Sequence, residues 1–160
     1  MLNKIGRTYV KTENFITDFL MIGVVFFVFI ASVMRWAGSP IPWSVEFAQL
    51  LFVWVIFLGA NRALREDRHI GVDFFTKKLP DRLRVTLEIL MMLLVMGFLI
   101  FIGYFGILLS IENSVRLISN LTMSYSFVTL SVPIGCILMI FTILIKIKEK
   151  IMALKTVSNS

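Results

Sequence analysis

Apolar and polar positions divide this chain into four long apolar runs separated by shorter polar segments. The runs cover residues 15–36, 43–62, 87–109 and 125–147. Each is about 20 residues long, and a helix of that length crosses the roughly 30 Å of bilayer hydrocarbon. Because backbone groups in lipid must bond within their own segment, each run predicts a transmembrane helix. We therefore expect an all-α integral membrane fold in which residues 1–160 form a single four-helix domain.

The segments between the runs differ in character. Residues 37–42 contain two prolines and a glycine, which predicts a tight turn between the first two spans. Trp36 and Trp43 flank this turn, where indole rings fit the membrane–water boundary. The connection at residues 110–124 mixes polar and apolar side chains. This mixture suggests a short helix that dips into the interface.

The connection between spans two and three, residues 63–86, predicts a short amphipathic helix. Asp73 is a plausible N-cap, and Val72, Phe75 and Leu79 then fall on one helical face. Such a helix is suited to the membrane interface, with its apolar face toward lipid.

Basic residues are distributed very unevenly over the polar segments. Of the 16 Lys and Arg residues, 14 lie in the N-terminal tail, the connection between spans two and three, or the C-terminal tail. Only Arg35 and Arg116 lie on the other side. By the positive-inside rule, both termini should be cytoplasmic. The net charge of +6 then reflects topology and contact with anionic lipid headgroups, and no nucleic-acid-binding segment is evident.

The composition leaves little basis for catalysis. Hydrophobic residues make up 58% of the chain, well above the range of soluble domains. Cys136 is the only cysteine and is expected to be a small packing residue in span four, while His69 is the only histidine. A metal cluster, a bis-histidine haem or a nucleophile–base pair needs more such residues. We therefore expect no enzyme activity, no cofactor and no metal, and for His69 either a structural role or contact with a moving partner.

Acidic residues within the spans are the remaining candidates for chemistry. Glu46 lies one turn into span two. It either pairs with Arg35 across the hairpin, or with a partner protein, or it couples transport to an ion. Asp18 and Glu88 lie in first turns of their spans, where a carboxylate favours the helix dipole.

Small residues four positions apart indicate close helix packing. They occur at Gly59–Ala63, Gly106–Ser110 and Ser131–Gly135. Pro133 removes one helical hydrogen bond and should kink span four, and the hydroxyl groups of Thr129 or Ser131 are expected to satisfy the freed backbone groups.

Several short motifs resemble one known family. The motifs are Trp43-Ser44-Val45-Glu46, Phe52-Val53-Trp54, Gly59-Ala60, Ala63, Arg65, His69-Ile70-Gly71-Val72-Asp73, Leu79-Pro80-Asp81-Arg82 and Pro133-Ile134-Gly135. Together with the length and the four spans, they resemble the small, Q-type membrane subunit of tripartite ATP-independent periplasmic (TRAP) transporters. The chain departs from that pattern in having one acid at Val45-Glu46, where many relatives have two, and in the more polar Asn61-Arg62.

The resemblance implies a non-catalytic subunit of the bacterial inner membrane. In this family a large multi-span subunit carries the sodium and substrate sites and moves as an elevator, and a soluble periplasmic protein delivers an organic acid. The small subunit supports the stationary part of the large one, and overall similarity favours the sialic-acid systems over those for four-carbon dicarboxylates or keto acids. The implied partners are these two proteins and membrane lipids. The candidate structural or partner-interface residues are Arg35, Trp43, Glu46, Gly59, Arg62, Arg65, His69, Asp73, Pro133 and Gly135.

An alternative is a self-sufficient, homo-oligomeric ion-coupled transporter that uses Glu46. The small four-span multidrug transporters work as dimers around a glutamate in the first span. Here the first span has no acid beyond Asp18 at its edge. The chain therefore lacks the first-span glutamate on which the small multidrug transporters depend. We prefer the interpretation as a scaffold subunit of a TRAP transporter.

Overall fold

The computed structural model describes residues 2–66 and 81–158, and this part of the chain is almost entirely helical. Its helices are α1 (Leu2–Trp36), α2 (Pro42–Arg65), α4 (Asp81–Glu112), the short α5 (Ser126–Thr129) and α6 (Ser131–Ser158). Four stretches are long and apolar enough to cross a membrane: Thr8–Trp36, Pro42–Arg65, Val85–Glu112 and Ser126–Met152. The prediction of an all-helical chain with four long apolar helices is confirmed.

All four long helices extend beyond the apolar runs at the end that carries most of the basic residues. The first begins at Leu2, not near residue 15, and the second ends at Arg65, not at residue 62. The third begins at Asp81, and the last continues to Ser158. The expected interfacial helix containing Val72, and the candidate residues His69 and Asp73, lie outside the described residues.

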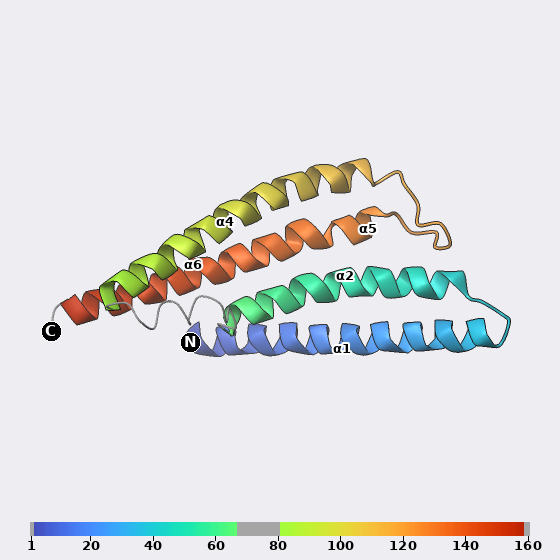
Figure 1. Ribbon diagram of the computed structural model, residues 1–160, viewed down its shortest axis with the longest axis horizontal. Helices are drawn as coiled ribbons and strands as arrows, with labels where there is room; N and C mark the ends of the chain where they lie inside the picture. Colours follow the sequence, from blue (N-terminus) through green and yellow to red (C-terminus); the bar gives the residue numbers. More distant parts are fainter. Residues whose placement is uncertain (1, 67–80, 159–160) are drawn as a thin grey trace.

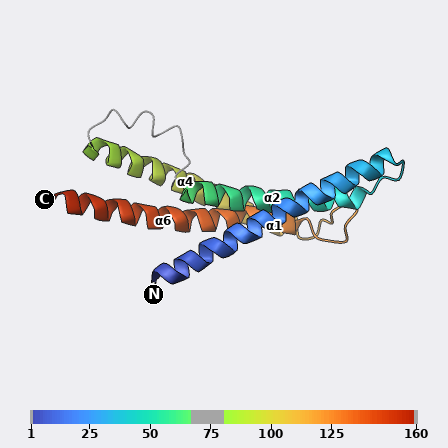
Figure 2. The ribbon, with the colours of Figure 1, turned by 90° about the horizontal axis from the view of Figure 1, so that it is seen from below.

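The four long helices lie side by side in the order α1, α2, α6 and α4 (Figure 1). Helix α2 packs against both α1 and α6, and α4 packs against α6. Turning the molecule shows that α1 crosses α2, so that its N-terminal end diverges from α6 (Figure 2). The two edge helices are consequently poorly covered: only 6% of the most apolar window of α1 and of α4 is buried, against 44% for the last span.

The turn between α1 and α2 has the predicted Gly- and Pro-dependent form. Gly38 adopts a positive φ of 79°, a conformation that favours glycine. The Ser39 amide then reaches back to the Met34 carbonyl at 3.0 Å, which closes the end of α1. Pro42 starts α2, where a missing N–H costs nothing.

The last span has a break at Leu130, between α5 and α6 and three residues before Pro133, although Leu130 keeps helical dihedral angles. The kink at Pro133 itself stays a prediction. The hydroxyl of Ser131 donates to the Val128 carbonyl at 2.7 Å, and that of Thr129 donates to the Ser126 carbonyl at 3.2 Å. Both hydroxyl groups bond to carbonyls near the break, but neither is directed at the Thr129 carbonyl, which is the group that Pro133 leaves without a donor. The expectation that they satisfy the freed group is therefore not met.

The connection between α4 and α5 differs from the expectation of a dipping helix. It is a hairpin-like turn closed by a bridge between Leu117 and Ser124, with no helix between Glu112 and Ser126. The Ser124 hydroxyl bonds to the carbonyls of Asn113 and Ser114, at 3.2 and 2.8 Å. These side-chain bonds give the backbone an alternative to helical pairing, which explains why the helical expectation was wrong here.

The apolar core lies between α2, α4 and α6. It contains Leu64, Leu99, Cys136, Met139 and Ile143, so Cys136 is a buried packing residue. Two of the three small-residue pairs border this core. A Cβ on Gly106 would lie 3.0 Å from Val132, and one on Gly135 would lie 2.6 Å from Phe57. A Cβ on Gly59 would meet nothing within 4 Å, so the third pair forms no seam in the described part of the chain.

Candidate functional site

Polar contacts between helices occur at two levels of the bundle, and the first is near the α1–α2 turn. Glu46, in the second turn of α2, accepts hydrogen bonds from both the backbone and the side-chain nitrogens of Asn120, at 2.7 and 2.6 Å. The carboxylate therefore fastens the tip of the α4–α5 connection to α2. This contact replaces the predicted pair with Arg35. We call the Glu46–Asn120 contact the outer clasp.

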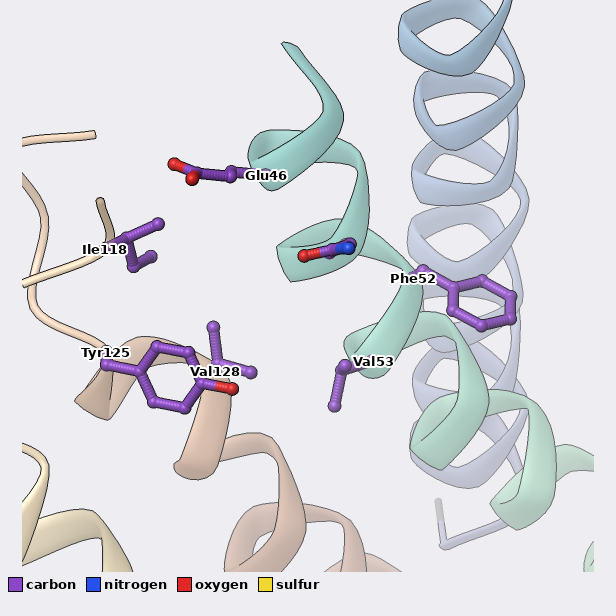
Figure 3. Close-up of a pocket in the computed structure, with 7 residues that line it drawn as sticks. Glu46, Phe52, Val53, Ile118, Tyr125 and Val128 are labelled. Atoms are coloured by element: carbon purple, nitrogen blue, oxygen red, sulfur yellow. The ribbon is translucent and has the colours of Figure 1, made fainter. Parts of the chain in front are cut away.

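The outer clasp borders a cleft between α2 and the α5 segment (Figure 3). The cleft has a volume of about 220 Å³ and is lined by Glu46, Gln49, Phe52, Val53, Ile118, Tyr125 and Val128. Figure 3 shows Glu46 directed across the gap toward the segment that carries Ile118. The lining is mainly apolar, and its only charged group already has hydrogen-bond donors. The cleft therefore offers packing space, with no arrangement of groups for proton transfer or nucleophilic attack.

The broken end of the last span provides a further link to α2. The indole nitrogen of Trp54 donates to the Phe127 carbonyl at 3.1 Å. Phe127 lies in the short helix α5, just before the break at Leu130. The link joins the hairpin formed by α1 and α2 to the hairpin formed by α4 and α6.

The second level of polar contacts is a buried cluster at the opposite end of the bundle. Asn61 of α2 is completely buried, and its amide nitrogen donates to the Glu13 carboxylate at 2.6 Å. Its amide oxygen accepts a bond from the Thr142 hydroxyl at 2.7 Å. Asn61 thus joins α1, α2 and α6 through one side chain.

Arg65 completes this cluster one helical turn further along α2. Its guanidinium donates to the second carboxylate oxygen of Glu13 at 2.6 Å and to the side-chain oxygen of Asn14 at 2.9 Å. The exposed fraction of the Glu13 side chain is 5%, and that of Arg65 is 20%. We call Glu13, Asn14, Asn61, Arg65 and Thr142 the inner cluster. Every buried side-chain nitrogen and oxygen among the described residues has a hydrogen-bond partner.

Sequence reasoning missed the role of Glu13. The residue lies two positions before the start of the first apolar run, so it was treated as part of the tail. A signal was present in Asn61, an amide within a continuous apolar run, because a buried amide needs partners. Its partners lie 48 and 81 residues away along the chain, which local pattern cannot indicate.

Three more ion pairs join side chains of the long helices. Arg62 binds Asp18 of α1 and Glu66 of its own helix, each at 3.1 Å. Glu88 of α4 is paired with Lys150 of α6. Asp18 and Glu88 therefore have cationic partners on other helices, beyond the favourable dipole position expected from sequence.

The remaining sequence-predicted residues are dispersed. Arg35 and Trp43 lie near the α1–α2 turn, where Arg35 is exposed and the Trp43 ring packs edge-on against Phe27. Pro133 and Gly135 are buried in the α6 interface, whereas Gly59 faces open space. In residues 2–66 and 81–158, no group of three or more His, Cys, Asp or Glu residues is placed to hold a metal ion. The candidate residues that are packed form helix contacts, and in the described part of the chain no single catalytic site gathers them.

Comparison with known proteins identifies the family. Residues 24–152 match the family described as "Tripartite ATP-independent periplasmic transporters, DctQ component". The sialic acid TRAP transporter small permease protein SiaQ of Vibrio cholerae is 32% identical over 130 residues, 79% of this chain and 73% of the relative. The sialic acid TRAP transporter permease protein SiaT of Haemophilus influenzae is 31% identical over 133 residues, 82% of this chain. This chain matches only 21% of that longer relative.

A relative named for another substrate matches over a shorter segment. The C4-dicarboxylate TRAP transporter small permease protein DctQ of Vibrio cholerae is 29% identical over 83 residues, 51% of this chain and 36% of the relative. The family match covers most of the chain, and the likeness to SiaQ extends over most of both proteins. The chain therefore belongs to the DctQ family: it is a small permease component of a TRAP transporter, a membrane transport protein and not an enzyme.

Proposed function

We propose that this chain is the stationary scaffold of a sodium-coupled, binding-protein-dependent importer, with both termini on the cytoplasmic side of a bacterial inner membrane. In this proposal a large permease subunit binds substrate and sodium and moves, while the present chain holds its fixed part in the bilayer. The observation that carries the proposal is the pattern of polar contacts. The outer clasp and the inner cluster join the two hairpins at both ends of the bundle.

Such a double attachment favours a part that does not move. An ion-coupling site needs a carboxylate that can exchange its partners during transport, yet both oxygens of Glu46 accept bonds from Asn120. The edge helices α1 and α4 leave long apolar faces uncovered, which suits a subunit that borders lipid and a larger protein. Arg62 and Arg65 would stabilise the cytoplasmic end, and Gly59 is proposed to lie against the large subunit, because small residues permit close helix approach.

The substrate proposed is sialic acid. Two relatives named for sialic acid transport match over 130 and 133 residues, whereas the relative named for C4-dicarboxylates matches over 83. The test is uptake into proteoliposomes that contain this chain, its large subunit and its binding protein. Sialic acid uptake that depends on a sodium gradient is expected, and uptake of a C4-dicarboxylate alone would contradict the assignment.

The scaffold role is tested in the same vesicles with Glu46→Gln. A neutral side chain at this position weakens the outer clasp, so we expect less complex to be recovered. The number of sodium ions per substrate should stay the same. A changed ion-to-substrate ratio would instead identify Glu46 as a coupling residue and overturn the scaffold role.

A further inference from the structure

Helix α2 has an exposed face, although it packs against both α1 and α6. The exposed positions recur every three or four residues, at Gln49, Phe52, Ile56, Ala60 and Ala63. That spacing places them on one side of the helix. We call these five residues the open face of α2.

The open face carries a polar group that the chain leaves unpaired. Three amide side chains lie in the spanning helices: Asn14, Gln49 and Asn61. Asn14 and Asn61 are hydrogen-bonded to neighbouring helices, whereas the exposed Gln49 side chain takes part in no hydrogen bond in the described part of the chain. With Trp43 at the membrane boundary, as expected from its sequence position, Gln49 lies about 9 Å further into the bilayer. Hydrocarbon offers no bonding partner there, so the amide calls for a polar group from another protein helix.

The small residues of the open face also distinguish it from the exposed faces of the other long helices. Those faces consist mainly of bulky apolar side chains, such as Phe19 on α1, Leu94 on α4 and Ile137 on α6, which are exposed by 66, 66 and 62%. The alanines of the open face lie beside Gly59, where an added Cβ would meet nothing within 4 Å. Bulky apolar side chains suit lipid, whereas small residues allow a second helix to approach closely.

The cleft between α2 and the α5 segment continues the open face toward the outer clasp. Gln49 and Phe52 belong both to the open face and to the lining of the cleft. Its volume of about 220 Å³ is below the roughly 300–1,000 Å³ of small-molecule pockets. The cleft therefore suits a single side chain that projects from a neighbouring helix.

We propose that the open face of α2 packs against a membrane helix of the large permease subunit, and that Gln49 hydrogen-bonds to a polar group of that helix. The inference rests on the scaffold function proposed above. The partner helix must offer a hydrogen-bonding group at the depth of Gln49, an apolar surface against Phe52 and Ile56, and a close backbone at Ala60. The relative SiaT supports this choice of partner, because the segment similar to this chain forms only 21% of that longer permease protein.

Photo-cross-linking in native membranes identifies the neighbour of the open face. Ile56, which is 47% exposed, is replaced by the photoreactive residue benzoylphenylalanine. The matched controls are the same replacement at Ile22 of α1 and at Ile100 of α4, which are 68 and 56% exposed. We expect an adduct between this chain and the large subunit from position 56, and no protein adduct from the two control positions.

Two substitutions test the contact by affinity, in a detergent titration of this chain with the purified large subunit. Gln49→Leu removes the amide and should lower the affinity about fivefold, the effect of one interhelical hydrogen bond. Ala60→Leu adds bulk where the helices approach and should lower the affinity about tenfold. The matched control is Gly97→Leu, at an exposed position of α4 where an added Cβ meets nothing within 4 Å, and it should leave the affinity nearly unchanged. Thermal unfolding of each variant chain shows whether it is still folded.

Several results would overturn the proposal. An adduct of twice the mass of this chain would make a second copy the neighbour, and adducts with lipid alone would leave the open face in the bilayer. Equal losses of affinity in A60L and G97L would mean that the contact is not specific to α2. The scaffold function would survive these results if the unaltered chain still bound the large subunit, whereas an unaltered chain that bound no large subunit would contradict the scaffold function itself.

Discussion

The carboxylate of Glu13 is almost completely buried between the helices. The free-energy cost of burying its charge depends on its hydrogen-bond and ion-pair partners. Asn61 and Arg65 supply a donor to each of its oxygens. Taking a carboxylate out of water costs several kcal/mol, and a paired guanidinium offsets much of that cost. Glu13 and Arg65 are therefore better regarded as one unit than as two independent residues.

The unit makes a specific prediction for a double-mutant cycle. Arg65→Gln leaves the Glu13 charge buried without its cation, and should lower the stability by about 3–5 kcal/mol. The double variant E13Q/R65Q removes both charges and should be more stable than R65Q alone. Thermal unfolding of the purified protein in detergent measures each value. If the double variant lost as much as the two single changes added together, the two residues would not be coupled.

Two glycines of the small-residue pairs, Gly59 and Gly135, should differ in how substitution by alanine changes the stability of the chain. At Gly135 an added Cβ would lie 2.6 Å from Phe57, and relieving that overlap should cost about 1–3 kcal/mol. At Gly59 nothing lies within 4 Å, so Ala should be neutral or stabilise the isolated chain by up to about 1 kcal/mol, because Ala favours helix. Thermal unfolding of both variants tests this difference. Similar destabilisation by both would mean that Gly59 is packed within the chain.

At the scale of elements, the sequence predicted the helices better than their connections. Twenty-residue apolar runs can only be helices in lipid, so their number and type were determined by length alone. The start of α1 at Leu2 was missed, because polar residues such as Glu13 and Asn14 end an apolar run even when a neighbouring helix binds them. The prediction of a short helix in the α4–α5 connection was also wrong. The form of this connection depends on Asn120 reaching Glu46, 74 residues earlier in the chain.

The break between α5 and α6 is expected to depend on Trp54 and Pro133 together. Trp54→Phe removes the bond to the Phe127 carbonyl and should cost about 1 kcal/mol. Pro133→Ala restores a donor for the Thr129 carbonyl and allows the helix to continue through Leu130. In that background the indole bond should be weaker, so Trp54→Phe should cost less.

Circular dichroism melts of the single and double variants measure this coupling. The control is Trp36→Phe, the same chemical change at a side chain that is 91% exposed, which should have little effect. Simple additivity of W54F and P133A would show that the indole bond does not depend on the break.

At the scale of the whole molecule, four helices arranged in a row leave two edges without a protein neighbour (Figure 1). Each edge helix packs mainly against one long helix, so α1 and α4 remain largely exposed, and their apolar faces are available to lipid or to another subunit. Helices α2 and α6 lie in the middle of the row. The outer clasp joins α2 to the α4–α5 connection, the Trp54 indole joins α2 to α5, and Asn61 joins α2 to α6. The scaffold proposal therefore requires that the two hairpins keep a fixed relation during transport.

A cross-link at the outer clasp tests this requirement directly. In E46C/N120C the two new thiols lie where a hydrogen-bonded pair lay before, so a short bifunctional thiol reagent should join them. Cys136 is 1% exposed and should not react. If the chain is stationary, cross-linked complexes in proteoliposomes should transport at nearly the rate of the untreated variant, because only the large subunit moves. The single variants E46C and N120C, treated with the same reagent, control for modification alone. Transport that stops only in the cross-linked double variant would show that the hairpins move against each other, and the chain would then be part of the moving machinery.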